Sequence, residues 1–202
     1  TMNDRLGSLV RPMTRGELLF MDVNGKDRAA YAGGNRASQL THALPGDQDH
    51  VVVTDYLPST RREEVDVVLY MVNAKTAKGR VLAYSPVPNA FFLVDNEGNP
   101  RVAAGVRGYN QGEVHYYNAE SKEWKLIHEQ AKSEQDMYPV RMHPDGVRFY
   151  AMITHPSGTN GAYLVSPGGE TQLVARDEVS DPTTPVYSTD GNELIAIDFL
   201  AA

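Results

Sequence analysis

Short apolar runs alternate with polar turns along the whole chain, and two turn patterns recur at one spacing. The first pattern is an apolar run that enters a polar turn, found at residues 21–26, 70–76, 115–121 and 163–169. Its turn-opening residues are 49, 45 and 48 residues apart: Asn24, Asn73, Asn118 and Ser166. This regular return of one pattern indicates an internal structural repeat.

A second turn pattern, built on an Asp followed closely by Gly, lies between the copies of the first. It occurs at residues 94–98, 143–146 and 188–191, and the distances from Asp95 to Asp145 and from Asp145 to Asp190 are 50 and 45 residues. Two turn patterns that share a period of about 45 to 50 residues predict repeated antiparallel units of four strands. This is the length of one blade of a β-propeller.

The apolar runs between these turns predict sixteen strands at most, all joined to their chain neighbours. Residues 18–23 and 28–31 form the first hairpin, the trailing half of a unit, for which Asn24-Gly25 predicts a tight two-residue turn. Residues 65–72 are almost continuously apolar, which is typical of a strand buried on both faces. We expect a loop at residues 105–112. Residues 119–136 could be helical on composition alone, but the repeat favours strand and loop, with a short helical turn within residues 129–135.

The expected fold class is therefore all-β, with antiparallel four-stranded blades of a partial β-propeller: about three full units and two half units. Residues 1–15 form an irregular N-terminal segment, and residues 16–202 carry the blades. The leading half unit could complete the trailing one and close a ring of four. An open arc would instead leave apolar edge strands unpaired, and we would then expect edge-to-edge pairing between copies of the chain.

Composition narrows the class of protein but not its compartment. Hydrophobic residues make up 41% and charged residues 22% of the chain, as in ordinary globular proteins. The net charge of −7 argues against nucleic-acid binding. No apolar run approaches the ~20 residues of a membrane helix, and no secretory signal is present. Because Thr1-Met2 is an unusual start, we expect a processed form, an expression product or a fragment. Periplasmic and cytoplasmic locations both stay open.

No catalytic, cofactor-binding or metal-binding residue is predicted, and the substrate-binding residues stay unknown. The sequence lacks the Gly-x-Ser-x-Gly nucleophile elbow, and it has no cysteine for thiol catalysis. No two of the six histidines have a metal-binding spacing, so structural roles are expected for His42, His50, His115, His128, His143 and His155. The chain alone is expected not to be an enzyme.

For three further features we prefer a structural role over a functional one. The run from Asp95 to Asn99 resembles a calcium loop, but its twelfth position is Val106 and not a glutamate, so a hairpin turn is favoured. The charged cluster Arg61-Arg62-Glu63-Glu64 is expected to be a solvated loop, although paired charges there could also meet a peptide terminus. The aromatic residues lie mostly in expected strands, where packing between blades accounts for them.

An ordered set of segments resembles the propeller of the prolyl oligopeptidase-like (S9) serine peptidases. Residues 17–25 resemble a "G-x-L-Y-x-x-N-x-D-G" segment and residues 68–79 a "V-Y-R-V-D-x-x-T-G-K" segment. Residues 92–103 are similar to "W-x-x-D-x-x-G-x-x-R-x-A", and residues 142–150 to "F-S-P-D-G-x-x-L-Y". Residues 181–198 resemble the last propeller hairpin before the hydrolase domain. The order holds over residues 16–199, and the blade pattern is also TolB-like.

This resemblance implies a dipeptidyl- or acylaminoacyl-peptidase-like parent protein. In that family the propeller filters substrates by size and docks short peptides for an α/β-hydrolase domain that carries the catalytic residues. No such domain is in this sequence, so the missing domain is an expected partner and no catalytic residue carries over. Two alternatives stay open: a stand-alone propeller that binds a protein or peptide, and a closed ring of four units that holds an ion in its channel.

Overall fold

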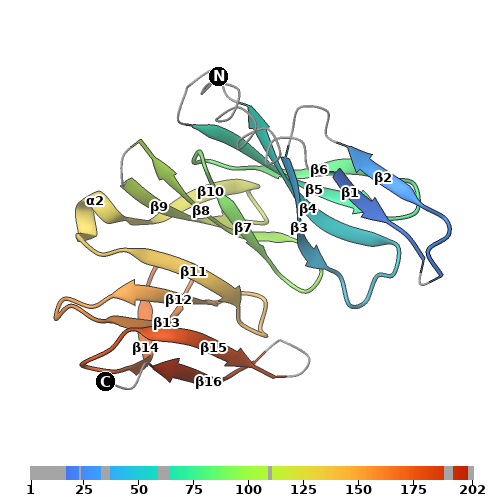
Figure 1. Ribbon diagram of the computed structural model, residues 1–202. Coiled ribbons are helices and arrows are strands. Elements are labelled where there is room, and N and C mark those ends of the chain that lie inside the picture. Colours follow the sequence, from blue (N-terminus) through green and yellow to red (C-terminus); the bar gives the residue numbers. More distant parts are fainter. Residues whose placement is uncertain are drawn as a thin grey trace, which may run out of the picture. The chain divides into compact units, whose positions relative to one another are not determined.

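The computed structural model describes residues 17–22, 24–32, 37–58, 64–108, 111–188 and 193–199. Within these ranges the regular structure consists of β-strands and one short helix (Figure 1). The strands are β1 (Glu17–Phe20), β2 (Ala29–Ala32), β3 (Ala37–Ala43), β4 (His50–Pro58), β5 (Val65–Asn73), β6 (Lys78–Tyr84), β7 (Phe91–Val94), β8 (Pro100–Arg107), β9 (Gln111–Asn118), β10 (Glu123–Glu129), β11 (Met137–Met142), β12 (Phe149–Thr154), β13 (Asn160–Val165), β14 (Thr171–Arg176), β15 (Pro182–Tyr187) and β16 (Leu194–Phe199). The helix is α2 (Gln130–Ser133). Among the described residues, no helix is long and apolar enough to cross a membrane.

The strands form three four-stranded sheets and two two-stranded sheets, each in simple chain order. The four-stranded sheets are β3-β4-β5-β6, β7-β8-β9-β10 and β11-β12-β13-β14, and the two-stranded sheets are β1-β2 and β15-β16. The pairs β1-β2, β3-β4, β4-β5, β5-β6, β8-β9, β9-β10, β11-β12, β12-β13, β13-β14 and β15-β16 are all antiparallel. The expected three full units and two half units are therefore confirmed. By its internal contacts the chain divides into two compact units, residues 1–100 and 101–202.

Apolar side chains on both faces of the middle strands form the core of each unit. In the first unit Val67, Val68 and Leu69 follow one another along β5 and are at most 2% exposed. Successive side chains of a strand point to opposite faces, so β5 is buried on both faces, as its sequence predicted. In the second unit Phe149 and Val165 are fully buried and face each other across β12 and β13. Each such side chain contributes about 1.5–3 kcal/mol through burial.

One turn geometry explains the second sequence pattern. At the β7–β8 turn the Asp95 amide donates to the Asn99 carbonyl, and the Gly98 amide donates to the Asp95 carbonyl. Gly98 has a φ of 81°, which glycine adopts without strain. At the β11–β12 turn Gly146 has a φ of 68°, as expected of an Asp-Gly turn. The third copy, Asp190-Gly191, lies outside the described residues.

The first sequence pattern divides into two geometries. Asn73 and Asn118 are equivalent, because each side-chain oxygen accepts the amides two and three residues further along the chain. Ser166 instead has the bonds of Asp95, since its amide donates to the Glu170 carbonyl and its carbonyl accepts from Gly169. The β1–β2 loop has these bonds too, with Asp22 as the opening residue. Choosing Asn24 as the opening residue was therefore wrong by two positions.

Two loop lengths and one helix also test the sequence interpretation. Pairing of β1 with β2 ends at Phe20 and Ala29, so the tight two-residue turn at Asn24-Gly25 was wrong. The Asp22 carboxylate opens this loop instead, by accepting the amides of Asn24 and Lys26. The loop expected at residues 105–112 is shorter, because β8 and β9 stay paired as far as Arg107 and Gln111. The short helical turn within residues 129–135 is confirmed by α2. The segment 1–15 lies outside the described residues.

Candidate functional site

Five of the six histidines have side chains in contact with groups close to them in the sequence. His50 lies 2.8 Å from Asp47, His128 lies 2.9 Å from the Gln135 carbonyl, and His143 lies 3.1 Å from Asp145. His115 and His155 have close partners in Glu113 and Ser157. Across the described ranges, no group of three or more His, Asp or Glu side chains could hold a metal ion. The structural roles expected of the six histidines stay a prediction.

The Asp95 segment is a hairpin turn, as its sequence predicted. One oxygen of the Asp95 carboxylate accepts the amides of Glu97 and Asn99, and the other accepts the Asn99 side-chain amide. The carboxylate is 2% exposed, so its oxygens are engaged in fixing the turn. Of the charged cluster, Arg61, Arg62 and Glu63 lie outside the described residues, and only Glu64, just before β5, is described.

A buried carboxylate joins three strands of the first unit. Asp55 on β4 is fully buried and accepts hydrogen bonds from the Tyr31 hydroxyl at 2.9 Å and the Ser38 hydroxyl at 2.7 Å. Tyr31 lies on β2 and Ser38 on β3, so this network ties the β1–β2 hairpin to the neighbouring sheet. Local sequence patterns do not predict this network, since Tyr31 is 24 residues from Asp55. We assign this network to stability, because a buried carboxylate needs such donors.

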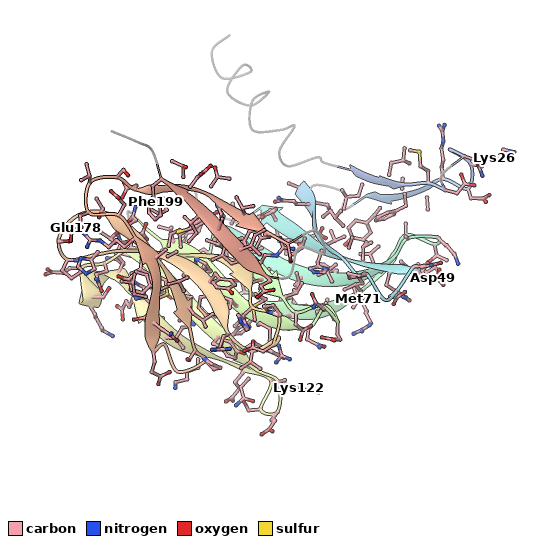
Figure 2. The ribbon with its side chains drawn as sticks, turned by 90° about the horizontal axis from the view of Figure 1, so that it is seen from below. Lys26, Asp49, Met71, Lys122, Glu178 and Phe199 are labelled. Carbon is pink, nitrogen blue, oxygen red and sulfur yellow. The ribbon has the colours of Figure 1, made fainter. Side chains whose placement is uncertain are left out.

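A groove in the second unit lies at the end of β9 and β10 where their hairpin turns. Its volume is about 820 Å³. The lining residues come from one sheet and from the turns of the next: Arg101, Tyr116, Tyr117, Asn118, Ala119, Glu120, Ser121, Glu123, Trp124, Lys125, Val147, Pro167 and Gly168. We refer to this site as the β9–β10 groove. Lys122, at the tip of the same hairpin, marks this end of the sheet in Figure 2.

The walls of the groove are held by local hydrogen bonds and ring contacts. The Asn118 side chain accepts the amides of Glu120 and Ser121 and so fixes the turn. The buried Tyr116 donates from its hydroxyl to the Val147 carbonyl at 2.8 Å, which joins β9 to the β11–β12 turn. The groove therefore has a preformed wall built from two adjacent sheets of the same unit.

An aromatic pair and charges of both signs supply the chemistry of the groove. Tyr117 and Trp124 face each other across β9 and β10, with ring centroids 4.9 Å apart and planes tilted by 58°. Both side chains are half-buried, so each keeps exposed ring surface. Arg101 and Lys125 bring positive charge to the lining, while glutamates at positions 120 and 123 bring negative charge. Such a surface can stack on apolar groups and pair with both ends of a zwitterion.

Two other polar features of the second unit are smaller. Arg107 and His115 lie 2.9 Å from the two oxygens of Glu113, at the opposite end of β9 from the groove. Partial burial opposes ionisation of Glu113, but the bonds from Arg107 and His115 outweigh it and lower the pKa of this carboxyl. A second cleft of about 370 Å³ includes His128 and His155 in its lining. Neither feature has an aromatic pair beside charges of both signs.

The sequence interpretation missed the groove. It assigned the aromatic residues to packing between blades, which fits the buried Tyr116 but not the half-exposed Trp124. The sequence does hold a signal for the aromatic pair. Tyr117 and Trp124 lie at equal distances before and after the β9–β10 turn. Two aromatic residues placed in this way around a turn face each other in a hairpin.

Comparison with known proteins places the fold. No protein-family model matches the chain, and no curated protein matches it. Among solved structures, TolB from Acinetobacter baumannii is 15% identical with a TM-score of 0.56, covering 90% of this chain and 43% of that one. The β-propeller domain of the Trilobed protease from Pyrococcus furiosus, described as having an open velcro topology, is 11% identical with a TM-score of 0.47, covering 74% and 45%.

The chain thus spans less than half the length of either protein. At 15% identity the likeness to TolB concerns the fold alone, and it agrees with the repeated four-stranded sheets. The TolB-like interpretation of the sequence is confirmed at this level. The chain has the fold of a partial β-propeller, in which three complete blades stand between two half blades.

Proposed function

We propose that this chain is a non-catalytic propeller module that docks short peptides in the β9–β10 groove. The observation that carries the proposal is the Tyr117–Trp124 pair beside charges of both signs. A short peptide has a carboxylate at one end, an ammonium group at the other and side chains between them. Arg101 suits the carboxylate, because a guanidinium can bind it through two parallel hydrogen bonds. The aromatic pair offers a rigid apolar contact for a side chain.

We further propose that the module serves a serine-peptidase hydrolase domain of the S9 type, encoded outside this sequence. The support is the ordered set of propeller segments that resemble that family, together with the lack of a nucleophile elbow in this chain. The propeller would admit short peptides and hold them for cleavage elsewhere. Labelling of this chain itself by an active-site serine probe would contradict the proposal.

Affinity selection tests the docking step. The chain is immobilised and offered a random mixture of tetra- to hexapeptides, and the retained peptides are then titrated by calorimetry. Lys125→Glu reverses a charge in the groove and should weaken binding about three- to tenfold, equivalent to ~0.7–1.4 kcal/mol. Lys26→Glu makes the same change in the exposed β1–β2 loop and should leave affinity unchanged. Equal affinities for both variants, or no retained peptide, would refute the groove as the docking site.

The second candidate is a stand-alone propeller that binds a protein or peptide partner. It is favoured by the β9–β10 groove, whose aromatic pair and charges of both signs lie within propeller sheets and could meet a partner without a hydrolase domain. The coding sequence around this chain separates the two candidates. A downstream Gly-x-Ser-x-Gly segment supports the peptidase, whereas a stop codon after Ala202 supports the stand-alone module.

A further inference from the structure

Two openings of the second unit share a border: the β9–β10 groove and the cleft of about 370 Å³ lined by His128 and His155. We refer to the second opening as the histidine cleft. The β13–β14 turn lines both openings, with Gly168 in the groove and Gly169 in the cleft. Strand β10 also lines both, with Trp124 in the groove and His128 in the cleft. The two openings therefore follow one another along the same strand.

The ridge between the openings is built from backbone and glycine. A Cβ at Gly169 would lie 2.7 Å from the Ile127 carbonyl oxygen, so the turn lies directly against β10 at this point. Gly169 also has a φ of 94°, which suits glycine. The preceding residue, Gly168, is exposed and has no side chain either. Neither glycine places a side chain between the groove and the histidine cleft, so an extended peptide can pass from one to the other.

The length of β10 sets the spacing between two peptide side chains. Trp124 and His128 are four residues apart, which is ~13 Å along a strand at ~3.3 Å per residue. An extended peptide needs about the same number of residues to cover this distance. A peptide whose anchor residue packs on the Tyr117–Trp124 pair would therefore bring a side chain about four positions away to the histidine cleft.

The hydrogen bonds of His155 set its tautomer. The Ser157 backbone amide donates to His155 Nδ1 at 3.1 Å. A ring nitrogen that accepts a hydrogen bond has no proton, so the neutral imidazole has its proton on Nε2. His155 therefore supplies a hydrogen-bond donor to the lining of the cleft.

His128 has the complementary role. Its Nε2 lies 2.9 Å from the Gln135 carbonyl oxygen, which can only accept, so this nitrogen has the proton. In the neutral ring Nδ1 then has a lone pair and is an acceptor. One donor and one acceptor suit a carboxamide, which has a carbonyl oxygen and an NH2 group. A carboxylate has no proton for Nδ1 of His128, and a metal ion would need a lone pair where His155 has a proton.

We propose that the histidine cleft is a second subsite for peptides docked in the β9–β10 groove, and that it takes the carboxamide side chain of a glutamine or asparagine about four positions from the anchor residue. This inference rests on the peptide docking proposed for the groove. The cleft has the size of small-molecule sites, which run from about 300 to 1,000 Å³. Tyr163 and Thr171 add hydroxyl groups to its lining.

Selection from a random mixture of hexapeptides tests the spacing. The peptides retained by the immobilised chain are sequenced and aligned on their aromatic or apolar anchor residue. We expect glutamine and asparagine to be enriched at one position about four residues from the anchor, and not elsewhere.

A matched pair of substitutions tests the contact with His155. His155→Asn removes the Nε2 donor but keeps an acceptor for the amide two residues further on, the role that Asn73 and Asn118 have in their own turns. His143→Asn is the control, because His143 accepts the Asp145 amide in the same way but lies outside the lining of both openings.

Calorimetry then compares a retained peptide with an analogue whose carboxamide residue is replaced by alanine. On the unaltered chain and on His143→Asn, the alanine analogue should bind about three- to tenfold more weakly, as expected from the loss of a hydrogen bond. On His155→Asn the two peptides should bind within about twofold of each other, because the partner of the carboxamide is gone.

The outcomes separate this inference from the proposed function. If retained peptides are lost on Lys125→Glu but show no carboxamide position, or if the alanine analogue is weakened equally on His155→Asn, the second subsite is refuted while docking in the groove stands. If no peptide is retained, or if Lys125→Glu binds peptides as the unaltered chain does, docking itself is refuted and the second subsite with it.

Discussion

Two glycines in the same turn position allow the cost of packing to be measured apart from the cost of backbone strain. Gly98 and Gly25 have φ angles of 81° and 72° and make the same hydrogen bond back to the turn-opening aspartate. A Cβ at Gly25 would meet no atom within 4 Å. A Cβ at Gly98 would lie 2.9 Å from methyl carbons of Leu44 and Val52 and 3.2 Å from the Met71 methyl.

Alanine at either position has a left-handed backbone, which costs about 1–2 kcal/mol. At Gly98 the added methyl also presses on Val52, which is fully buried and cannot move away freely. Overpacking of this kind costs a further ~1–3 kcal/mol. We therefore expect Gly98→Ala to lower the free energy of unfolding by about 2–5 kcal/mol, and Gly25→Ala by about 1–2 kcal/mol.

Urea denaturation followed by circular dichroism measures both losses. Because both substitutions are in the first unit, they are compared on the same transition, provided that its slope against urea stays unchanged. The reasoning would be refuted if the two variants lost the same stability. It would also be refuted if the free energy of unfolding of Gly98→Ala lay within about 0.5 kcal/mol of that of the unaltered chain, which is the range of a neutral substitution.

Three further predictions concern polar contacts. Tyr31→Phe removes a hydrogen-bond donor to the buried Asp55 and should lower the free energy of unfolding by about 1.5–3 kcal/mol. Urea denaturation measures this loss, and an unchanged free energy of unfolding would contradict a stabilising role for the network. Tyr116→Phe removes the hydrogen bond to the Val147 carbonyl and should lower the free energy of unfolding by about 1 kcal/mol. Thermal unfolding measures this loss, and an unchanged melting temperature would contradict it. Partial burial opposes ionisation of Asp145, but hydrogen bonds from the following turn amides and an arginine outweigh it, so its pKa is lowered. Its stabilising effect is therefore full above the unfolded value of about 3.9 and fades as the pH falls below it, so the deficit of Asp145→Asn should shrink from pH 6 to pH 2. A deficit that grows with acid would contradict this sign.

The blades could be predicted from the sequence because their signals are local. An aspartate or asparagine that accepts amides two to four residues further on fixes its own turn, and this chemistry repeats in Asp95, Asn73 and Asn118. The same local reasoning gave a wrong prediction at the β1–β2 loop, because Asn24-Gly25 is a typical sequence for a two-residue turn. There the Asp22 side chain, two residues earlier, opens a longer loop.

The groove and the buried network could not be predicted in this way, because their parts come from distant positions. Tyr116 meets Val147 across 31 residues, and Tyr31 meets Asp55 across 24. Such contacts depend on how one sheet packs against the next, which the repeat period does not specify. The half blades were counted correctly from the sequence, because each is a local hairpin with its own turn.

Fluorescence of Trp124 offers the most direct test of peptide docking, since it is the only tryptophan of the chain and lines the groove. A short peptide retained by affinity selection is titrated against the chain while the emission maximum is followed. We predict a saturable shift to shorter wavelength, because a docked peptide would exclude water from the indole. An emission spectrum that stays unchanged while calorimetry records binding would place the peptide elsewhere and contradict the account.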